Sequence, residues 1–316
     1  MATATELRRL LGQPGPIVAP GCYDCISALA TEQAGFRAGF VSGAAVTASV
    51  LGYPDVGLQT MPEILNQVRN MASRVGIPLL VDVDTGYGNA LNVMRTVREF
   101  EAAGAAGIFF EDQSFPKRCG HFEGKSVIST EEMVVKVKAA CAARRNPDFV
   151  IVARTDARAT HGLQEAIARG RAYASAGADV IFVEALLDEG EMREVARSVP
   201  ALLQANLNEG DKTPVLHFDL LHRIGFKIIS YSGLLQRTAL RGMANSLEML
   251  QREGSALSLY PSQICSLVER SALLGLDRFY RLEEALYGPI VDSAKSWREE
   301  LADRAWRRDA SDSIPV

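Results

Sequence analysis

The chain has 316 residues, 47% of them hydrophobic, and can therefore bury a large core, which excludes intrinsic disorder as the default state. A formal net charge of −4 without a long basic run argues against nucleic acid or an anionic membrane as a partner, and no apolar run approaches the roughly 18 residues that span a bilayer. We therefore expect a cytoplasmic enzyme that acts on a small molecule, with its five cysteines reduced.

Short β-rich runs recur along the chain, and helix-like stretches separate several of them. The runs cover residues 17–21, 39–43, 78–86, 107–112, 149–156, 180–185, 201–208 and 226–233. Most are continuous apolar runs, which are typical of strands buried on both faces. About eight such β/α units in roughly 250 residues predict an α/β fold, a closed (β/α)8 barrel of the TIM type rather than an open sheet.

The pattern changes after Arg237, where only helical stretches follow. We predict a catalytic barrel domain over residues 1–240, without an internal linker, and a helical extension over residues 241–316 that ends in a polar tail. The extra helices exceed what closing a barrel requires, so we expect them to cover a neighbouring surface.

Polar residues close most of the predicted strands, and in a barrel of this kind the carboxyl ends of the strands build the active site. The set comprises Ser42, Gly43, Asp82, Asp84, Glu111, Asp112, Arg154, Asp156, Glu184, Asn206, Asn208, Ser230 and Ser232. Side chains alternate along a strand, so Asp82 and Asp84 are expected to point to one side, as are Arg154 and Asp156.

Carboxylates that converge in a confined site require a proton or a cation. An all-oxygen donor set without paired histidines favours Mg²⁺ over Zn²⁺. The alternative is that each acid only caps the helix that follows its strand.

The segment FPKRCGHFEGK, residues 115–125, follows the fourth predicted strand. Cys119 has no second Cys/His pair at zinc-ligand spacing, so a zinc site is not supported. Its neighbours Lys117, Arg118 and His121 can be cationic, and such a setting lowers a thiol pKa and makes the thiol a proton donor or a nucleophile. An ordinary surface loop with an incidental cysteine is the open alternative.

Four motifs occur in order: VDVDTGYGN, FFEDQ followed by KRCGH, VIVARTDA and FVEA. Together they resemble the isocitrate lyase and phosphoenolpyruvate mutase superfamily over about residues 15–290. The KRCGH segment is similar to the loop of the lyase branch, which closes over the substrate. Closest in appearance are the short lyases, namely 2-methylisocitrate lyase, 2,3-dimethylmalate lyase and the oxaloacetate hydrolase group.

The resemblance implies a role for each matching residue. Asp82, Asp84 and, through water, Glu111 would hold Mg²⁺, or Mn²⁺ in its place. The implied substrate-binding set is Ser42, Gly43, Ala44, Asp82, Gly120, Arg154, Glu184, Asn206 and Arg237, with Ala44 a departure from the glycine that many relatives carry. The implied catalytic set is Cys119 as the general acid, Lys117 and His121 beside it, Glu111 and Asp55.

Several points stay open at this stage. The general base is one of Asp55, Glu111, Tyr87 or a metal-bound water. The resemblance also implies a homotetramer in which a C-terminal helix is swapped onto a neighbour's barrel.

The expected reaction is a Mg²⁺-dependent retro-aldol cleavage of a 2-hydroxy dicarboxylate to pyruvate, or another 2-oxo acid, and a short carboxylic acid. 2-Methylisocitrate lyases resemble this chain but carry a further arginine in a C-terminal QTR segment, where this chain reads YPSQIC with Gln263. A third substrate carboxylate would lack that partner, so a 2,3-dimethylmalate-like substrate is favoured. The alternatives are 2-methylisocitrate lyase and oxaloacetate hydrolase.

Overall fold

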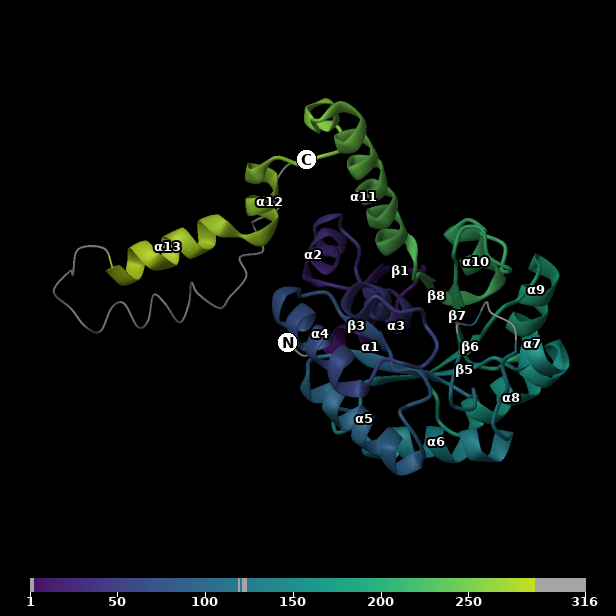
Figure 1. The fold of residues 1–316 in the computed structure, drawn as a ribbon. Helices are drawn as coiled ribbons and strands as arrows, with labels where there is room; N and C mark the ends of the chain where they lie inside the picture. Colours follow the sequence, from purple (N-terminus) through teal and green to yellow (C-terminus); the bar gives the residue numbers. More distant parts are fainter. Residues whose placement is uncertain (1–2, 119, 121–123, 288–316) are drawn as a thin grey trace. The chain divides into compact units, whose positions relative to one another are not determined.

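The computed structural model describes residues 3–118, 120 and 124–287 (Figure 1). The chain divides into two compact units, Met1–Arg241 and Gly242–Val316, and the division falls within helix α11 (Leu234–Glu253).

The first unit is a closed barrel of eight parallel strands, in which each strand pairs with its neighbours in the sequence and β1 pairs with β8. The strands are β1 (Ile17–Cys22), β2 (Gly39–Val41), β3 (Leu79–Asp82), β4 (Gly107–Glu111), β5 (Val150–Thr155), β6 (Val180–Val183), β7 (Leu202–Asn206) and β8 (Phe226–Tyr231). All eight predicted strands are present, and the predicted (β/α)8 barrel is confirmed.

Helices surround the barrel as an outer ring (Figure 1). They are α2 (Cys25–Gln33), α3 (Gly43–Val46) with a π-helical turn (Thr47–Leu51), α4 (Met61–Arg74), α5 (Ala90–Ala102), α6 (Thr130–Ala143), α7 (Ala157–His161), α8 (Leu163–Ser175), α9 (Glu189–Ser198) and α10 (Phe218–Ile224). α1 (Thr3–Gly12) instead packs against the barrel interior, and the first part of α11 follows β8 without a buried residue. Side-chain caps start several of them: Asp24 for α2, Asn89 for α5 and Asp188 for α9 accept backbone N–H groups of the first turn.

Two apolar layers hold the barrel together. One lies between the strands and the outer helices, and it buries the apolar stripe of each helix against the sheet. The other fills the barrel interior, where Leu7 and Leu10 of α1 pack with inward strand residues. Its upper layer is aromatic: the ring centroids of Phe40 and Phe109 are 5.2 Å apart, and those of Phe109 and Phe182 are 6.0 Å apart. These rings form the floor of the site described below.

Seven of the eight predicted strands, all but the first, end later in the sequence than the observed strands. Asp84 has φ of 50° and Ala185 has φ of 59°, so the backbone leaves the extended conformation just after β3 and β6. The expectation that strand alternation aligns Asp82 with Asp84 is therefore wrong, because Asp84 is not in the strand. Asp156 likewise follows the last residue of β5.

The second unit contains the rest of α11, a 3-10 turn (Leu257–Leu259), α12 (Leu267–Leu274) and α13 (Leu276–Tyr287). Many of its apolar side chains are exposed, among them Leu247, Leu257, Leu267 and Val268. None of the described helices is both long and apolar enough to cross a membrane. The predicted exchange of helices between subunits stays a prediction.

Candidate active site

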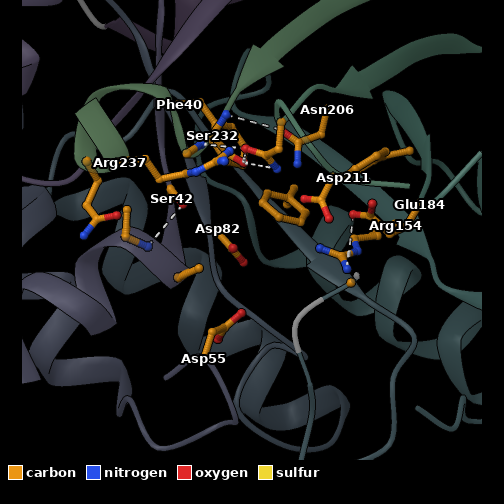
Figure 2. Close-up of a pocket in the computed structure, with 18 of the residues that line it drawn as sticks. Phe40, Ser42, Asp55, Asp82, Arg154, Glu184, Asn206, Asp211, Ser232 and Arg237 are labelled. Carbon is orange, nitrogen blue, oxygen red and sulfur yellow. Dashed lines mark hydrogen bonds and ion pairs between the residues drawn. The ribbon is translucent and has the colours of Figure 1, made fainter. Parts of the chain in front are cut away.

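A cavity of about 400 Å³ opens at the carboxyl ends of the strands (Figure 2). Most of the expected substrate-binding residues line it: Ser42, Ala44, Asp82, Gly120, Arg154, Glu184, Asn206 and Arg237, with Asp55 beside them. The sequence reasoning did not foresee the aromatic floor of Phe40, Phe109 and Phe182, or two exposed acids at the mouth, Glu209 and Asp211. The cavity has the size of a small-molecule site.

A group of acidic side chains lies beneath and beside the cavity. The backbone N–H of Gly43 donates to Asp82 Oδ2 at 3.3 Å, and the N–H of Asp84 donates to Asp82 Oδ1 at 3.0 Å. The ammonium of Lys117 lies 2.6 Å from Asp84 Oδ1 and also contacts Asp55. The expected pair Asp82 and Asp84 is therefore brought together, and Lys117 belongs to the same cluster.

Burial raises the pKa of Asp82 to about 7, and the neighbouring Asp84 charge adds to the rise. Burial likewise raises the pKa of Glu111 well above its ordinary value, although Arg154 and Lys117 oppose the rise. Lys117 behaves in the opposite way: burial alone would lower its pKa, but Asp84, Glu111 and Asp55 outweigh this and raise it. The cluster thus holds a fixed cation, and without a bound metal burial favours the protonated form of Asp82 and Glu111.

Arg154 joins three carboxylates on the other side of the cavity. Its Nε and Nη2 form a two-pronged pair with Asp156, at 2.9 Å and 3.0 Å. Its Nη1 lies 3.3 Å from Glu111 Oε2, and its Nη2 lies 3.2 Å from Glu184 Oε2. Arg154 is thus already paired with protein carboxylates, so a substrate carboxylate would share the guanidinium with them.

A hydrogen-bond network around Asp112 supports Asp156, the partner of Arg154. Asp112 is fully buried and accepts hydrogen bonds from Tyr173 Oη at 2.7 Å, Thr155 Oγ1 at 2.7 Å and the N–H of Asp156 at 2.9 Å. Arg169 completes this network at 3.1 Å from Asp112 Oδ2. The alternative that the acids at the strand ends serve as helix caps is wrong for Asp156, whose side chain caps no N–H of α7.

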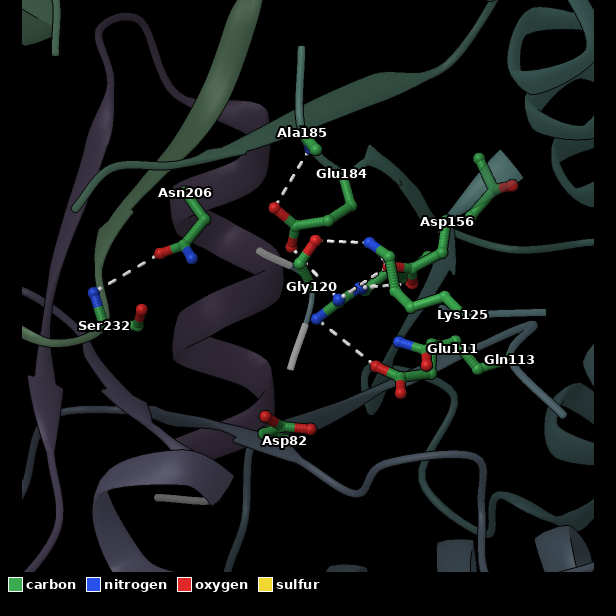
Figure 3. Close-up of polar contacts among 12 residues, drawn as sticks. Asp82, Glu111, Gln113, Gly120, Lys125, Asp156, Glu184, Ala185, Asn206 and Ser232 are labelled. Carbon is green, nitrogen blue, oxygen red and sulfur yellow. Dashed lines mark hydrogen bonds and ion pairs between the residues drawn. The ribbon is translucent and has the colours of Figure 1, made fainter. Parts of the chain in front are cut away.

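Lys125 is a further residue that the sequence reasoning missed. Its ammonium donates to Asp156 Oδ1 at 2.9 Å and to the carbonyl of Gly120 (Figure 3). The only sequence signal was its place in the charged segment that contains Lys117, and nothing there indicated burial.

The sequence profile of the phosphoenolpyruvate phosphomutase family matches residues 7–251 of the chain, which is the barrel together with most of α11. The chain belongs to this family. The resemblance to the isocitrate lyase and phosphoenolpyruvate mutase superfamily is thereby confirmed.

Relatives within the family include named lyases. The chain is 42% identical to the 2,3-dimethylmalate lyase of Eubacterium barkeri over 283 residues, which cover 90% of this chain and 98% of that protein. It is 46% identical to the 2-methylisocitrate lyase of Aeropyrum pernix over 249 residues, which cover 79% of this chain and 80% of that one. These relatives confirm the expectation that the chain is a carbon–carbon lyase of this superfamily.

Solved structures of family members share the whole fold. Oxaloacetate acetylhydrolase with the inhibitor 3,3-difluorooxalacetate superimposes with a TM-score of 0.87 at 33% identity and covers 92% of this chain and 99% of that chain. Phosphonopyruvate hydrolase in complex with oxalate and Mg²⁺ superimposes with a TM-score of 0.81 at 33% identity, covering 91% and 99%. A protein with this fold thus holds a divalent cation and a dicarboxylate.

The donor set of this chain fits such a cation. Glu111 Oε1 is buried and has no hydrogen-bond partner among the described residues. Apart from the exposed residues at the mouth, six carboxyl groups of the described site face three cationic side chains: Asp55, Asp82, Asp84, Glu111, Asp156 and Glu184 against Lys117, Lys125 and Arg154. No three His, Cys, Asp or Glu side chains of the described residues enclose a metal by themselves, but Mg²⁺ usually takes one or two carboxylates and completes its shell with water and substrate oxygens.

Two expected catalytic residues, Cys119 and His121, lie outside the described residues. Gly120 between them is described, as are the residues up to 118 and from 124 onward. Lys117 is buried in the acidic cluster, and Gly120 lines the cavity.

Proposed function

We propose that the chain is a Mg²⁺-dependent carbon–carbon lyase that cleaves a 2-hydroxy dicarboxylate of the 2,3-dimethylmalate type to pyruvate and a short carboxylic acid. One observation carries this proposal: buried carboxyl groups exceed cations around a cavity of about 400 Å³ that also has an aromatic floor. Such a site favours a cation together with a small anion that has apolar substituents.

The cavity offers matching groups for such a substrate. Asn206 accepts the backbone N–H of Ser232 through Oδ1, which turns its amide NH₂ away from Ser232. Buried Ser42 and exposed Arg237 contribute further polar groups to the lining. The floor of Phe40, Phe109 and Phe182 can pack against methyl groups. A dicarboxylate with methyl substituents therefore matches both surfaces.

Asp82 and Asp84 would hold Mg²⁺, with Glu111 reaching it through water. Bound there, Mg²⁺ would polarise the oxygens of the substrate and stabilise negative charge that develops on them. We assign Asp55 as the base that takes the hydroxyl proton, because it lines the cavity, is not paired with Arg154 and contacts Lys117.

Breaking the C–C bond leaves a 2-oxo acid and a carboxylate enolate, whose carbon must then accept a proton. Cys119 is proposed as this acid, with Lys117 and His121 beside it, on the grounds of the KRCGH segment. Arg154 would bind a substrate carboxylate while its pairing with Asp156 fixes its plane.

Two other activities are represented among the relatives. Oxaloacetate hydrolysis is favoured by the structural similarity to oxaloacetate acetylhydrolase, with its TM-score of 0.87. Methylisocitrate cleavage is favoured by the 46% identity to a 2-methylisocitrate lyase, but Gln263 argues against a third substrate carboxylate.

Product analysis separates these three. The protein with Mg²⁺ is incubated with 2,3-dimethylmalate, 2-methylisocitrate or oxaloacetate, and the products are followed by proton NMR. Pyruvate and propionate from the first substrate alone support the proposal. Succinate from the second substrate, or oxalate and acetate from the third, with no turnover of the first, would replace it.

We also propose that a cytoplasmic homotetramer is the working form, with residues 241–316 packing on neighbouring subunits as a separate extension. Exposed apolar side chains support this, since Leu257 is 76% exposed and Val268 is 78% exposed in the single chain. Light scattering at micromolar concentration measures the mass directly, and a monomer would contradict the proposal.

A further inference from the structure

Lys125 is a buried lysine in the connection between β4 and α6. Its side chain is only 2% exposed, although lysine is almost never buried without a charged partner. Two acceptors receive its ammonium, Asp156 Oδ1 at 2.9 Å and the carbonyl of Gly120 (Figure 3). Lys125 therefore ties the backbone of its own segment to the residue that follows β5.

The backbone of Gly120 lies directly against the site. A Cβ atom at this position would overlap Arg154 Nη2 and would lie 2.7 Å from Glu184 Cδ. Only glycine allows this approach, so the chain at Gly120 covers the ion pair of Arg154 and Glu184 without room for a side chain.

Asp156 is the common partner of both cations. It accepts Lys125 on Oδ1 and pairs with Arg154 through both of its oxygens. Burial alone would raise the pKa of Asp156, but Arg154 and Lys125 outweigh this and lower it to about 2. The carboxylate stays ionised and holds the two cations in one fixed arrangement.

The same segment has a second brace farther from the site. Gln113 Nε2 donates to the carbonyl of Arg118 at 2.8 Å, and the N–H of Arg118 donates back to Gln113 Oε1 at 2.9 Å. Residues 113 and 127 also form a bridge between the two ends of the segment. The brace at Gln113 shapes the segment, whereas Lys125 connects it to Asp156.

We propose that Lys125 is a positioning residue. Through its bonds to Asp156 and to the carbonyl of Gly120, it holds the backbone of Gly120 against the side chains of Arg154 and Glu184. It thereby fixes where these two side chains lie beside the substrate cavity. The inference rests on the proposed function for its activity readout. Lys125 does not touch the reacting atoms in this assignment. Its effect passes through Gly120 and Asp156.

The test compares Lys125→Met with Lys227→Met. Lys227 is also buried and donates to two backbone carbonyls, those of Gln13 and Gly15, but it lies at the opposite end of the barrel. Both variants should lose a similar amount of thermal stability. Only Lys125→Met should lower kcat, by about 100-fold with KM changed far less, because misplacing a site by about 1 Å costs that much.

Chemical rescue adds a second measurement, because added amine would not restore kcat if Lys125 served only the stability of the fold. In Lys125→Ala, methylammonium should restore kcat in a saturable manner because it can occupy the place of the ammonium, whereas tetramethylammonium, which donates no hydrogen bond, should not. A folded Lys125→Met that keeps kcat within about threefold of the parent would overturn the assignment. Equal rescue by methylammonium and tetramethylammonium would also overturn it.

Hydrogen exchange separates this inference from the proposed function. The amide hydrogens of the peptide that covers residues 112–118 should exchange about tenfold faster in Lys125→Met than in the parent. Their exchange rate should be unchanged in Lys227→Met. If the parent cleaves none of the three substrates, the proposed function fails, and the exchange result still decides whether Lys125 holds the segment. Unchanged exchange would contradict the role of Lys125.

Discussion

Asp82→Asn should stabilise the metal-free protein at alkaline pH while it abolishes activity. The pKa of Asp82 is raised from 3.8 to about 7, so the folded protein binds this proton more tightly than the unfolded chain does. The stability that the proton contributes is present below a pH of about 4 and is lost as the pH rises to about 7. At pH 8 Asp82 of the parent is a buried carboxylate beside Asp84, and the cost of burying this charge lowers the free energy of unfolding by its full amount.

The size of the effect follows from linkage. Between pH 5 and pH 8 the parent should lose about 3 kcal/mol through Asp82, and Asp82→Asn should lose none of it. The variant gives up one carboxylate acceptor, because the N–H groups of Gly43 and Asp84 each donate to a different oxygen, but that cost of about 1 kcal/mol does not depend on pH.

The assay is urea unfolding at pH 5, 6, 7 and 8 with a chelator present, followed by circular dichroism. The difference in unfolding free energy between variant and parent should move in favour of the variant as pH rises. Asp211→Asn, which changes an exposed acid of the same cavity, is the matched control. A difference that stays constant within about 0.5 kcal/mol over this range would refute the reasoning about Asp82.

The other predictions concern the arginine, the hydrogen-bond network around Asp112 and the metal. Arg154→Lys should lower kcat/KM by about 100-fold, measured by pyruvate release, because an ammonium cannot reproduce the two-pronged pair with Asp156; activity near that of the parent would contradict this. Tyr173→Phe should lower the unfolding free energy by about 1–2 kcal/mol, measured by urea unfolding, because buried Asp112 loses a donor at 2.7 Å, and kcat should stay unchanged. Chelation should abolish cleavage and added Mg²⁺ should restore it, whereas full activity in chelator would exclude the assigned role of Asp82.

The barrel was predictable because its strands are buried on both faces and so appear as separate apolar runs between helical stretches. The ends of those strands were less predictable. Asp84 and Ala185 take positive φ, a choice that depends on the packing of the loops around the site and not on the hydrophobic pattern. For the same reason alternation could not place Asp84, although both aspartates lie in one cluster.

Part of the site could be predicted and part could not. Polar residues at successive strand ends indicated one part of the cavity lining, since parallel strands bring their carboxyl ends together: Ser42, Asp82, Arg154, Glu184, Asn206, Asn208 and Ser232. Lys125 was not indicated, because a lysine in a charged segment is normally solvated and its burial depends on Asp156, which follows a different strand. The aromatic floor was hidden because Phe40, Phe109 and Phe182 look like ordinary core residues in the sequence.

The most direct test of the account is cleavage of 2,3-dimethylmalate in D₂O with Mg²⁺, followed by proton NMR. Retro-aldol cleavage predicts equal amounts of pyruvate and propionate, with one deuterium at C2 of the propionate where the enolate carbon accepted a proton from the enzyme. Absence of cleavage at enzyme concentrations that convert oxaloacetate to oxalate and acetate would contradict the account, and so would propionate without deuterium at C2.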